Sequence, residues 1–292
     1  MTSNSTEERY ALAEAWLQEH GADLPKFNTS LAGAIGTLNW DEGDIHELER
    51  LISSDPATIV CTLRAANSPF FGLSKRVDSI RHALTVLGLS SVRSILMRGY
   101  LADSFGIADK DRLAGDYVEH CIVSGLAARE LAAKYEVAQD TAFVAGVLQG
   151  VGKLMLLAYS RQQADAIYAD GDLTANCEPR EIELLGFDHV ELTVSTLRAW
   201  HMPDAITTAV DDAHRNRRNG SPLTRTILAA RLVADYVDHQ RFERMEEVVA
   251  VRAQLASVIG ESNVVKVLAR IHDEVSEMFS WAATQDGAES WT

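Results

Sequence analysis

The chain has 292 residues, of which 47% are hydrophobic and 24% are charged, with 6 Pro and 18 Gly. This composition excludes disordered, collagen-like and low-complexity proteins, and the length is sufficient for a large core in one or two domains. The 27 basic and 42 acidic side chains give a net charge of −15. So acidic a surface repels phosphate backbones and anionic lipid headgroups, which argues against nucleic-acid and membrane partners.

The cysteines and the N-terminal segment bear on the cellular compartment. Cys61, Cys121 and Cys177 lie far apart and form no CxxC or Cys/His cluster, so we expect neither a disulfide framework nor a zinc site. The first residues lack the basic and apolar regions of a signal peptide, and apolar runs such as 142–148 are too short to span a bilayer. We therefore expect a soluble, cytoplasmic protein.

Local start and stop signals indicate helices along the whole chain. A first helix is predicted from Thr6 to Gly21. Asp55-Pro56 and Ser221-Pro222 each place a capping side chain before a proline, as at a helix start, and Asn67-Ser68-Pro69 breaks the chain after a helix over 56–66. No long stretch alternates between apolar and polar residues as a half-buried strand does.

Three apolar stripes recur at helical spacing, over 117–132, 223–237 and 264–282. Within each stripe, successive apolar residues lie three or four positions apart, so they share one helix face. The last stripe approaches a heptad register. We expect it to pack on the chain's own core, and the alternative is a homodimer formed through the C-terminal helices.

Several motifs, taken in order, resemble those of the HDOD family, a branch of the HD phosphohydrolase superfamily. They are Asp55-Pro56, the loop Ala66-Asn67-Ser68-Pro69-Phe70-Phe71-Gly72, Ser79-Ile80 with Ala83, Leu87-Gly88, the segment 186–189 (GFDH) and Trp200 with Pro203. The resemblance covers roughly residues 20–240. It implies an all-α HDOD-type fold with an N-terminal helical lobe (21–110) and an HD-like helical lobe (111–240), flanked by a helical extension at 1–20 and another at 241–292.

The resemblance also implies where the superfamily's metal ligands would lie. His120 matches the first histidine and Asp235 the late aspartate, and His189 and His214 fall where binuclear relatives place further ligands. The adjacent His-Asp pair of active enzymes is replaced by Gln149 and Gly150.

This replacement removes about half of a mononuclear site. Gly150 has no side chain, and Gln149 offers a neutral amide oxygen in place of an imidazole. We therefore expect no catalytic residue, no metal and no cofactor. Gly146, Gly150 and Gly152 indicate close helix packing, and the alternative is a small pocket left where the metals would lie.

The resemblance implies a bacterial signalling or regulatory protein that is not an enzyme. It would act as a stand-alone output or scaffold module through protein partners, and the candidate partner-binding loop contains Asn67, Pro69, Phe70 and Phe71. The alternative is a residual metal-dependent phosphohydrolase, or a sensor that binds a nucleotide or another small molecule in the remnant site.

Overall fold

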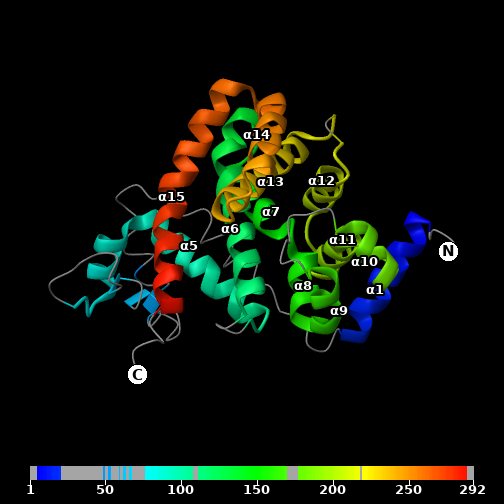
Figure 1. The fold of residues 1–292 in the computed structure, drawn as a ribbon, viewed down its shortest axis with the longest axis horizontal. Helices are drawn as coiled ribbons and strands as arrows, with labels where there is room; N and C mark the ends of the chain where they lie inside the picture. Colours follow the sequence, from blue (N-terminus) through cyan, green and yellow to red (C-terminus); the bar gives the residue numbers. More distant parts are fainter. Residues whose placement is uncertain are drawn as a thin grey trace.

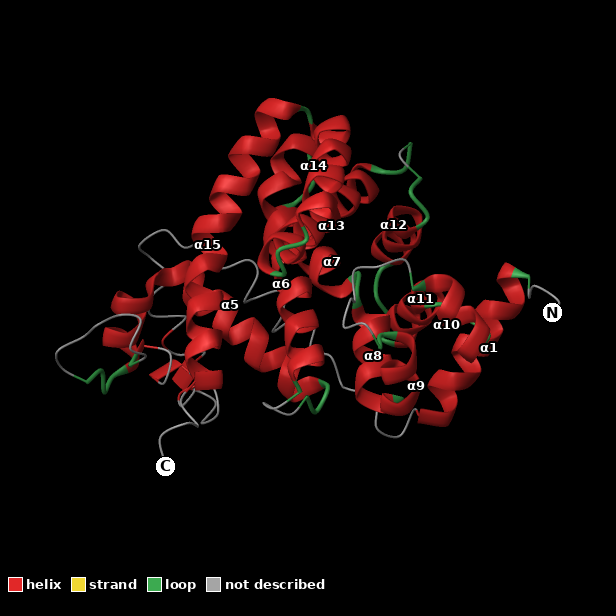
Figure 2. Cartoon of the chain, viewed as in Figure 1, coloured by secondary structure: helices red, strands yellow, loops and turns green. Residues whose placement is uncertain are grey.

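The computed structural model describes residues 5–20, 76–107, 111–169, 177–217 and 219–287, with isolated positions between 49 and 67. These residues form helices and loops, and no strand occurs among them (Figure 2). The fold class is therefore all-α, as predicted. The helices are α1 (Thr6–His20), α5 (Ile80–Ser104), α6 (Arg112–Ala132), α7 (Gln139–Leu148), α8 (Val151–Tyr159), α9 (Arg161–Ile167), α10 (Glu178–Leu185), α11 (His189–Ala199), α12 (Asp204–His214), α13 (Pro222–Arg241), α14 (Met245–Ile259) and α15 (Glu261–Gly287), with the 3₁₀ turn η3 (Ala133–Tyr135) after α6.

Helix boundaries follow the local signals where these can be compared. Helix α1 begins at Thr6, and α13 begins at Pro222 with Ser221 as its N-cap, whose hydroxyl accepts a hydrogen bond from the Thr224 amide. The predicted start at Asp55-Pro56 lies outside the described residues.

Helix α5 contains a kink that the motif Leu87-Gly88 explains. Gly88 has φ +72° and ψ 160°, which is not helical, so α5 consists of two helical pieces. A side chain at this φ and ψ would be strained, and glycine is the residue that adopts such a conformation without cost.

Helix α6 is the centre of the fold. Fifteen of its residues are buried, including Tyr117 and His120, and it packs against α7 and α13. Glycines allow α6 and α7 to approach closely, because a Cβ atom on Gly146 would lie 2.7 Å from the Ser124 carbonyl oxygen. A Cβ on Gly125 would lie 2.5 Å from a methyl group of Val147.

The C-terminal helices cover one side of this centre. In Figure 1, α13, α14 and α15 gather around α6, whereas α8 to α12 and α1 lie on the other side. Helix α15 packs on α14, α6 and α5, and Val264, Ile271 and Val275 of the predicted stripe are buried. The stripe therefore packs on the chain's own core up to Val275. The homodimer and the domain boundaries stay predictions.

Helices α7 and α8 together form an apolar segment longer than the run 142–148. Residues 139–159 have the length and the mean hydropathy (1.6) of a membrane span, but 83% of the most apolar window is buried inside the protein. The other apolar stretch, 245–275, consists of two helices bent by 117° at their junction. Because α7 and α8 contact α6, α11 and α13, we interpret the first segment as part of the core.

Candidate functional site

The break between α7 and α8 places Gln149 and Gly150 in the interior. The backbone amide of Gln149 donates to the Ala145 carbonyl (3.0 Å) at the end of α7, and Gly150 precedes the first residue of α8. Gln149 is 1% exposed, and neither Nε2 nor Oε1 of its side chain has a hydrogen-bond partner in the described part of the chain. A buried polar group in this state is rare in native proteins and is destabilising.

Side chains of α6 occupy the space beside Gly150. A Cβ atom here would lie 2.5 Å from the Tyr117 hydroxyl and 3.1 Å from the Cys121 sulfur. A Cβ on Gly152 would collide with the His189 carbonyl oxygen, and its amide already donates to the Thr193 hydroxyl (2.9 Å). These contacts indicate close packing at both glycines, and the alternative that they line a ligand pocket stays a prediction.

His120 pairs with an aspartate that the sequence analysis missed. Its Nδ1 lies 2.7 Å from Oδ2 of Asp238, and both residues are buried. The imidazole also stacks on the Tyr117 ring, with 5.2 Å between centroids and 8° between planes. Since the carboxylate takes Nδ1, the nitrogen left for any ligand is Nε2.

His189 has a second buried acid as its partner. Its Nδ1 and its backbone amide lie 2.7 and 2.8 Å from Oε2 of Glu181, and Oε1 of Glu181 accepts from the Tyr168 hydroxyl (2.7 Å). Burial by itself would raise the pKa of Glu181, but the charge and hydrogen bonds of His189 lower that pKa to about 2. Glu181 therefore stays ionised, and it orients the His189 ring.

His214 has both ring nitrogens engaged. Nε2 lies 2.8 Å from the backbone oxygen of Gln149, and Nδ1 lies 3.0 Å from a guanidinium nitrogen of Arg231. Arginine can only donate, so Nδ1 is the acceptor and Nε2 carries the proton given to Gln149. Burial lowers the pKa of His214 well below its usual value, and the nearby charges of Arg231, His189 and Lys153 lower it further. The ring is therefore neutral, with a fixed tautomer.

Lys153 and Asp235 complete the cluster. The ammonium of Lys153 lies 5.7 Å from the Tyr117 ring centre and 5.9 Å from that of Tyr168. Burial raises the pKa of Asp235, and the charges of His120 and Arg231 oppose this rise. The structure thus brings His120, Gln149, His189, His214 and Asp235 close together, and their role as a remnant site stays a prediction.

The residues present do not fit the metal centre of an HD phosphohydrolase. No group of three or more His, Cys, Asp or Glu among the described residues is arranged to hold a metal ion. The donor groups also argue against a metal ion, because both ring nitrogens of His214 are engaged in hydrogen bonds and Gly150 has no side chain to bind a metal. The Arg231 guanidinium supplies positive charge beside His214 instead.

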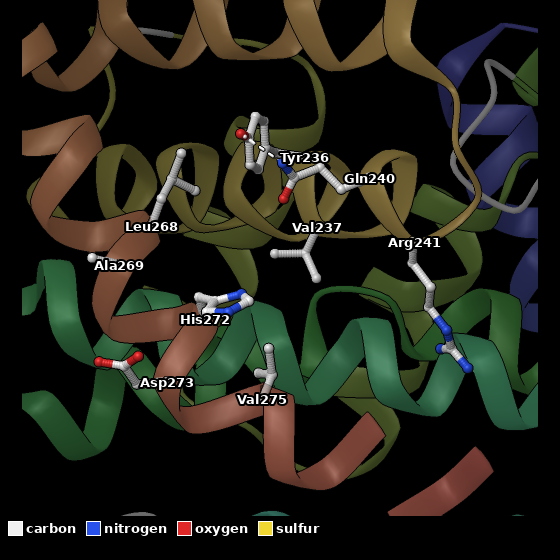
Figure 3. A pocket seen from close by; sticks show the side chains of 9 residues that line it. All are labelled: Tyr236, Val237, Gln240, Arg241, Leu268, Ala269, His272, Asp273 and Val275. Carbon is white, nitrogen blue, oxygen red and sulfur yellow. Dashed lines mark hydrogen bonds between the residues drawn. The ribbon is translucent and has the colours of Figure 1, made fainter. Parts of the chain in front are cut away.

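Two further features lie apart from this cluster. The side chain of Asn67 bonds to Leu63 and Val77 and so braces its own loop, while Pro69, Phe70 and Phe71 lie outside the described residues. A pocket of about 600 Å³ opens between α13 and α15 (Figure 3). Its lining comes from the C-terminal part of the chain: Tyr236, Val237, Gln240, Arg241, Leu268, Ala269, His272, Asp273 and Val275.

The fold and this cluster define an all-α protein in which buried histidines pair with acids from other helices. The family model for the HDOD domain matches residues 24–216, about two thirds of the chain. The protein therefore belongs to the HDOD family, as the motifs indicated. No curated protein matches its sequence.

Solved structures agree on the fold. The chain is similar to a candidate phosphohydrolase from Shewanella amazonensis SB2B, with 20% identity, a TM-score of 0.57, and 91% of this chain and 97% of that chain covered. An HDOD domain protein of unknown function from Geobacter sulfurreducens has 16% identity and a TM-score of 0.54, with 92% and 99% covered. A candidate signal transduction protein from Marinobacter aquaeolei VT8 has 19% identity and a TM-score of 0.54, with 87% and 59% covered.

Proposed function

We propose that this HDOD protein is a non-catalytic regulatory module of a bacterial signalling pathway, which acts in the cytoplasm through protein partners. The observation that carries the proposal is the network around His214. Both ring nitrogens bond to Gln149 and Arg231, at a site where a hydrolase would need lone pairs directed at a metal. Family membership and the description of the Marinobacter relative as a candidate signal transduction protein support the signalling part.

The arrangement also explains why hydrolysis is not expected. Metal-dependent hydrolysis needs an ion that lowers the pKa of a bound water and polarises a phosphoryl oxygen. Here, Gly150 lacks the carboxylate that would offset the ion's charge, and a cationic guanidinium next to His214 disfavours a second cation.

Metal analysis of protein purified without chelator tests the proposal directly. We expect less than about 0.1 equivalent of Fe, Mn or Zn per chain, and no metal-stimulated release of phosphate from nucleotides or cyclic dinucleotides. Stoichiometric metal that is lost in Asp235→Asn but retained in the exposed-site control His82→Ala would overturn it.

Complementation in the native cell tests the regulatory role. If the protein acts through partners, Asp235→Asn should restore the phenotype of a deletion strain as well as the wild-type gene does. Asp235 is half-buried and the substitution preserves its shape, so the variant is expected to fold. Failure of this folded variant, together with metal-dependent turnover by the wild type, would favour the hydrolase.

A further inference from the structure

Helix α14 is rich in apolar residues but is largely exposed. Ten of its fifteen residues are apolar, and only Val248, Leu255 and Ile259 are buried. By contrast, α6 buries fifteen of its twenty-one residues. Helix α14 lies at the edge of the molecule, where it packs against α13 and α15 (Figure 1). It therefore turns an apolar face to solvent, and an exposed apolar patch of this kind marks an interaction site.

The exposed large hydrophobic residues are concentrated around this helix. Six such residues occur in the described part of the chain, and four of them lie between positions 242 and 265: Phe242, Met245, Val249 and Val265. Met245 and Val249 lie four positions apart and share one side of α14, and Phe242 directly precedes the helix. We call Phe242, Met245 and Val249, together with the exposed Ala253, the α14 face.

The α14 face is large at its start and small at its end. Phe242 and Met245 lie at the start, whereas Ala253 and Ala256 lie in the second half of the helix. Val249 lies between them and is 68% exposed. Two such helices that run in opposite directions would place the large side chains of one against the alanines of the other.

The charges beside the α14 face have the same polarity. Residues 243–247 carry three acids and one base, and residues 252–266 carry two bases and one acid. In chain order these are Glu243, Arg244, Glu246 and Glu247 at the start, and Arg252, Glu261 and Lys266 at the end. An antiparallel pair of these helices brings the net negative start of one copy to the net positive end of the other.

The apolar stripe of α15 does not serve for such a contact. Val264, Ile271 and Val275 of that stripe are buried in the chain's own core. A dimer formed through the C-terminal helices must therefore use other residues, and the α14 face supplies them.

We propose that the α14 face is the contact surface of a homodimer, in which the α14 helices of two copies pack antiparallel about a two-fold axis near Val249. A two-fold interface requires a self-complementary surface, and the sizes and charges above meet this requirement. Because one pair of helices forms a contact smaller than the usual interface of about 1,600 Å², we expect a dissociation constant in the micromolar range. The dimer extends the proposed function, since it would present two copies of the module to its partners.

Sedimentation velocity of the full-length protein between about 1 and 200 µM tests the inference. We expect the sedimentation coefficient to rise from that of a monomer to that of a dimer over this range. Val249→Glu places two carboxylates against each other near the axis, so it should weaken dimerisation at least about tenfold. Leu184→Glu is the matched control, because Leu184 is 50% exposed on α10, and it should leave dimerisation unchanged.

Charge reversal tests the antiparallel orientation. Glu246→Lys combined with Glu247→Lys should weaken the dimer about two- to fivefold, because bases then meet the partner's basic end. Adding Lys266→Glu should recover part of this loss. If Val249→Glu does not reach the thermal midpoint of the wild type, Met245→Glu replaces it, with the same weakening expected.

Four results would overturn the inference. A wild type that stays monomeric up to about 200 µM would leave the α14 face to a different partner. A dimer that resists Val249→Glu, or that Leu184→Glu weakens equally, would place the contact elsewhere. Absence of recovery by Lys266→Glu would refute the antiparallel arrangement. A metal-free monomer would refute this inference alone, whereas metal-dependent turnover by a dimer would refute the regulatory proposal alone.

Discussion

The space beside Gly150 is filled by Tyr117, so adding a single methyl group there should destabilise the protein. Gly150 has φ −102° and ψ 6°, which alanine can adopt, so Gly150→Ala isolates packing from backbone strain. The new Cβ would lie 2.5 Å from the Tyr117 hydroxyl, and the Tyr117 ring is held by stacking on His120. Tyr117 therefore cannot move aside without disturbing a buried pair.

The expected magnitude follows from overpacking. An extra methyl group in a packed core costs about 1–3 kcal/mol in the free energy of unfolding, or about 2–6 °C in the thermal midpoint of a chain of this size. In open space, the same substitution would stabilise the protein by about 0.4–1 kcal/mol, because alanine restricts the unfolded chain. The two interpretations of Gly150 thus predict opposite signs.

Urea unfolding followed by circular dichroism measures the effect. Gly99→Ala is the matched control, because a Cβ on Gly99 meets no atom within 4 Å, and it should be neutral or stabilising. In a Tyr117→Phe background, Gly150→Ala should cost at least about 1 kcal/mol less, since the nearest oxygen is gone. Stabilisation by Gly150→Ala, or the same cost in both backgrounds, would refute the packing argument.

Three other predictions concern a cap, a kink and an acid. Ser221→Ala should lower the free energy of unfolding by about 0.5–2 kcal/mol in urea unfolding, because it removes the N-cap of α13, whereas the exposed control Ser257→Ala should change it little. Gly88→Ala should cost about 1–3 kcal/mol in the same assay, since φ is +72°, and a cost no larger than that of Gly99→Ala would contradict the kink. The pKa of Glu181 is lowered from 4.5 to about 2, a difference that corresponds to about 3 kcal/mol of stability of the folded protein. This contribution is complete above the unfolded pKa near 4.5 and is lost as pH falls toward 2. Glu181→Gln should therefore flatten stability between these pH values, and parallel pH profiles would contradict the assignment.

Local sequence signals were sufficient for helix starts and for the fold class. The N-cap Ser221 and the start of α1 at Thr6 could be predicted because capping depends on a few adjacent residues. The stripe over 117–132 indicated a helix with one buried face, but α6 is buried on nearly all sides. Periodicity locates one apolar face and does not reveal that neighbours cover the polar faces as well, because this depends on packing of α7 and α13.

The candidate site was predictable in its positions and not in its pairing. His120, His189 and His214 could be placed through family motifs, whereas their partners Asp238, Glu181 and Arg231 could not. The pair of His120 and Asp238 spans 118 positions, and no local pattern encodes such a contact. A weak signal did exist for two of these partners. Arg231 lies four positions before Asp235 and Asp238 lies three positions after it, so all three share one face of α13.

The glycine at position 150 and the contact between Arg231 and His214 both disfavour a bound cation at this cluster. The buried acids Asp238 and Glu181 bond to Nδ1 of His120 and Nδ1 of His189. His214 then accepts from Arg231 and donates to Gln149, which places a permanent cation next to the ring. Histidine and aspartate introduced at positions 149 and 150 would not by themselves build a metal centre, because Tyr117 fills the space that the aspartate needs and Arg231 occupies the lone pair of His214 Nδ1. The cluster is thus a network across α6, α7, α12 and α13, and a metal centre there would require changes on several of these helices together.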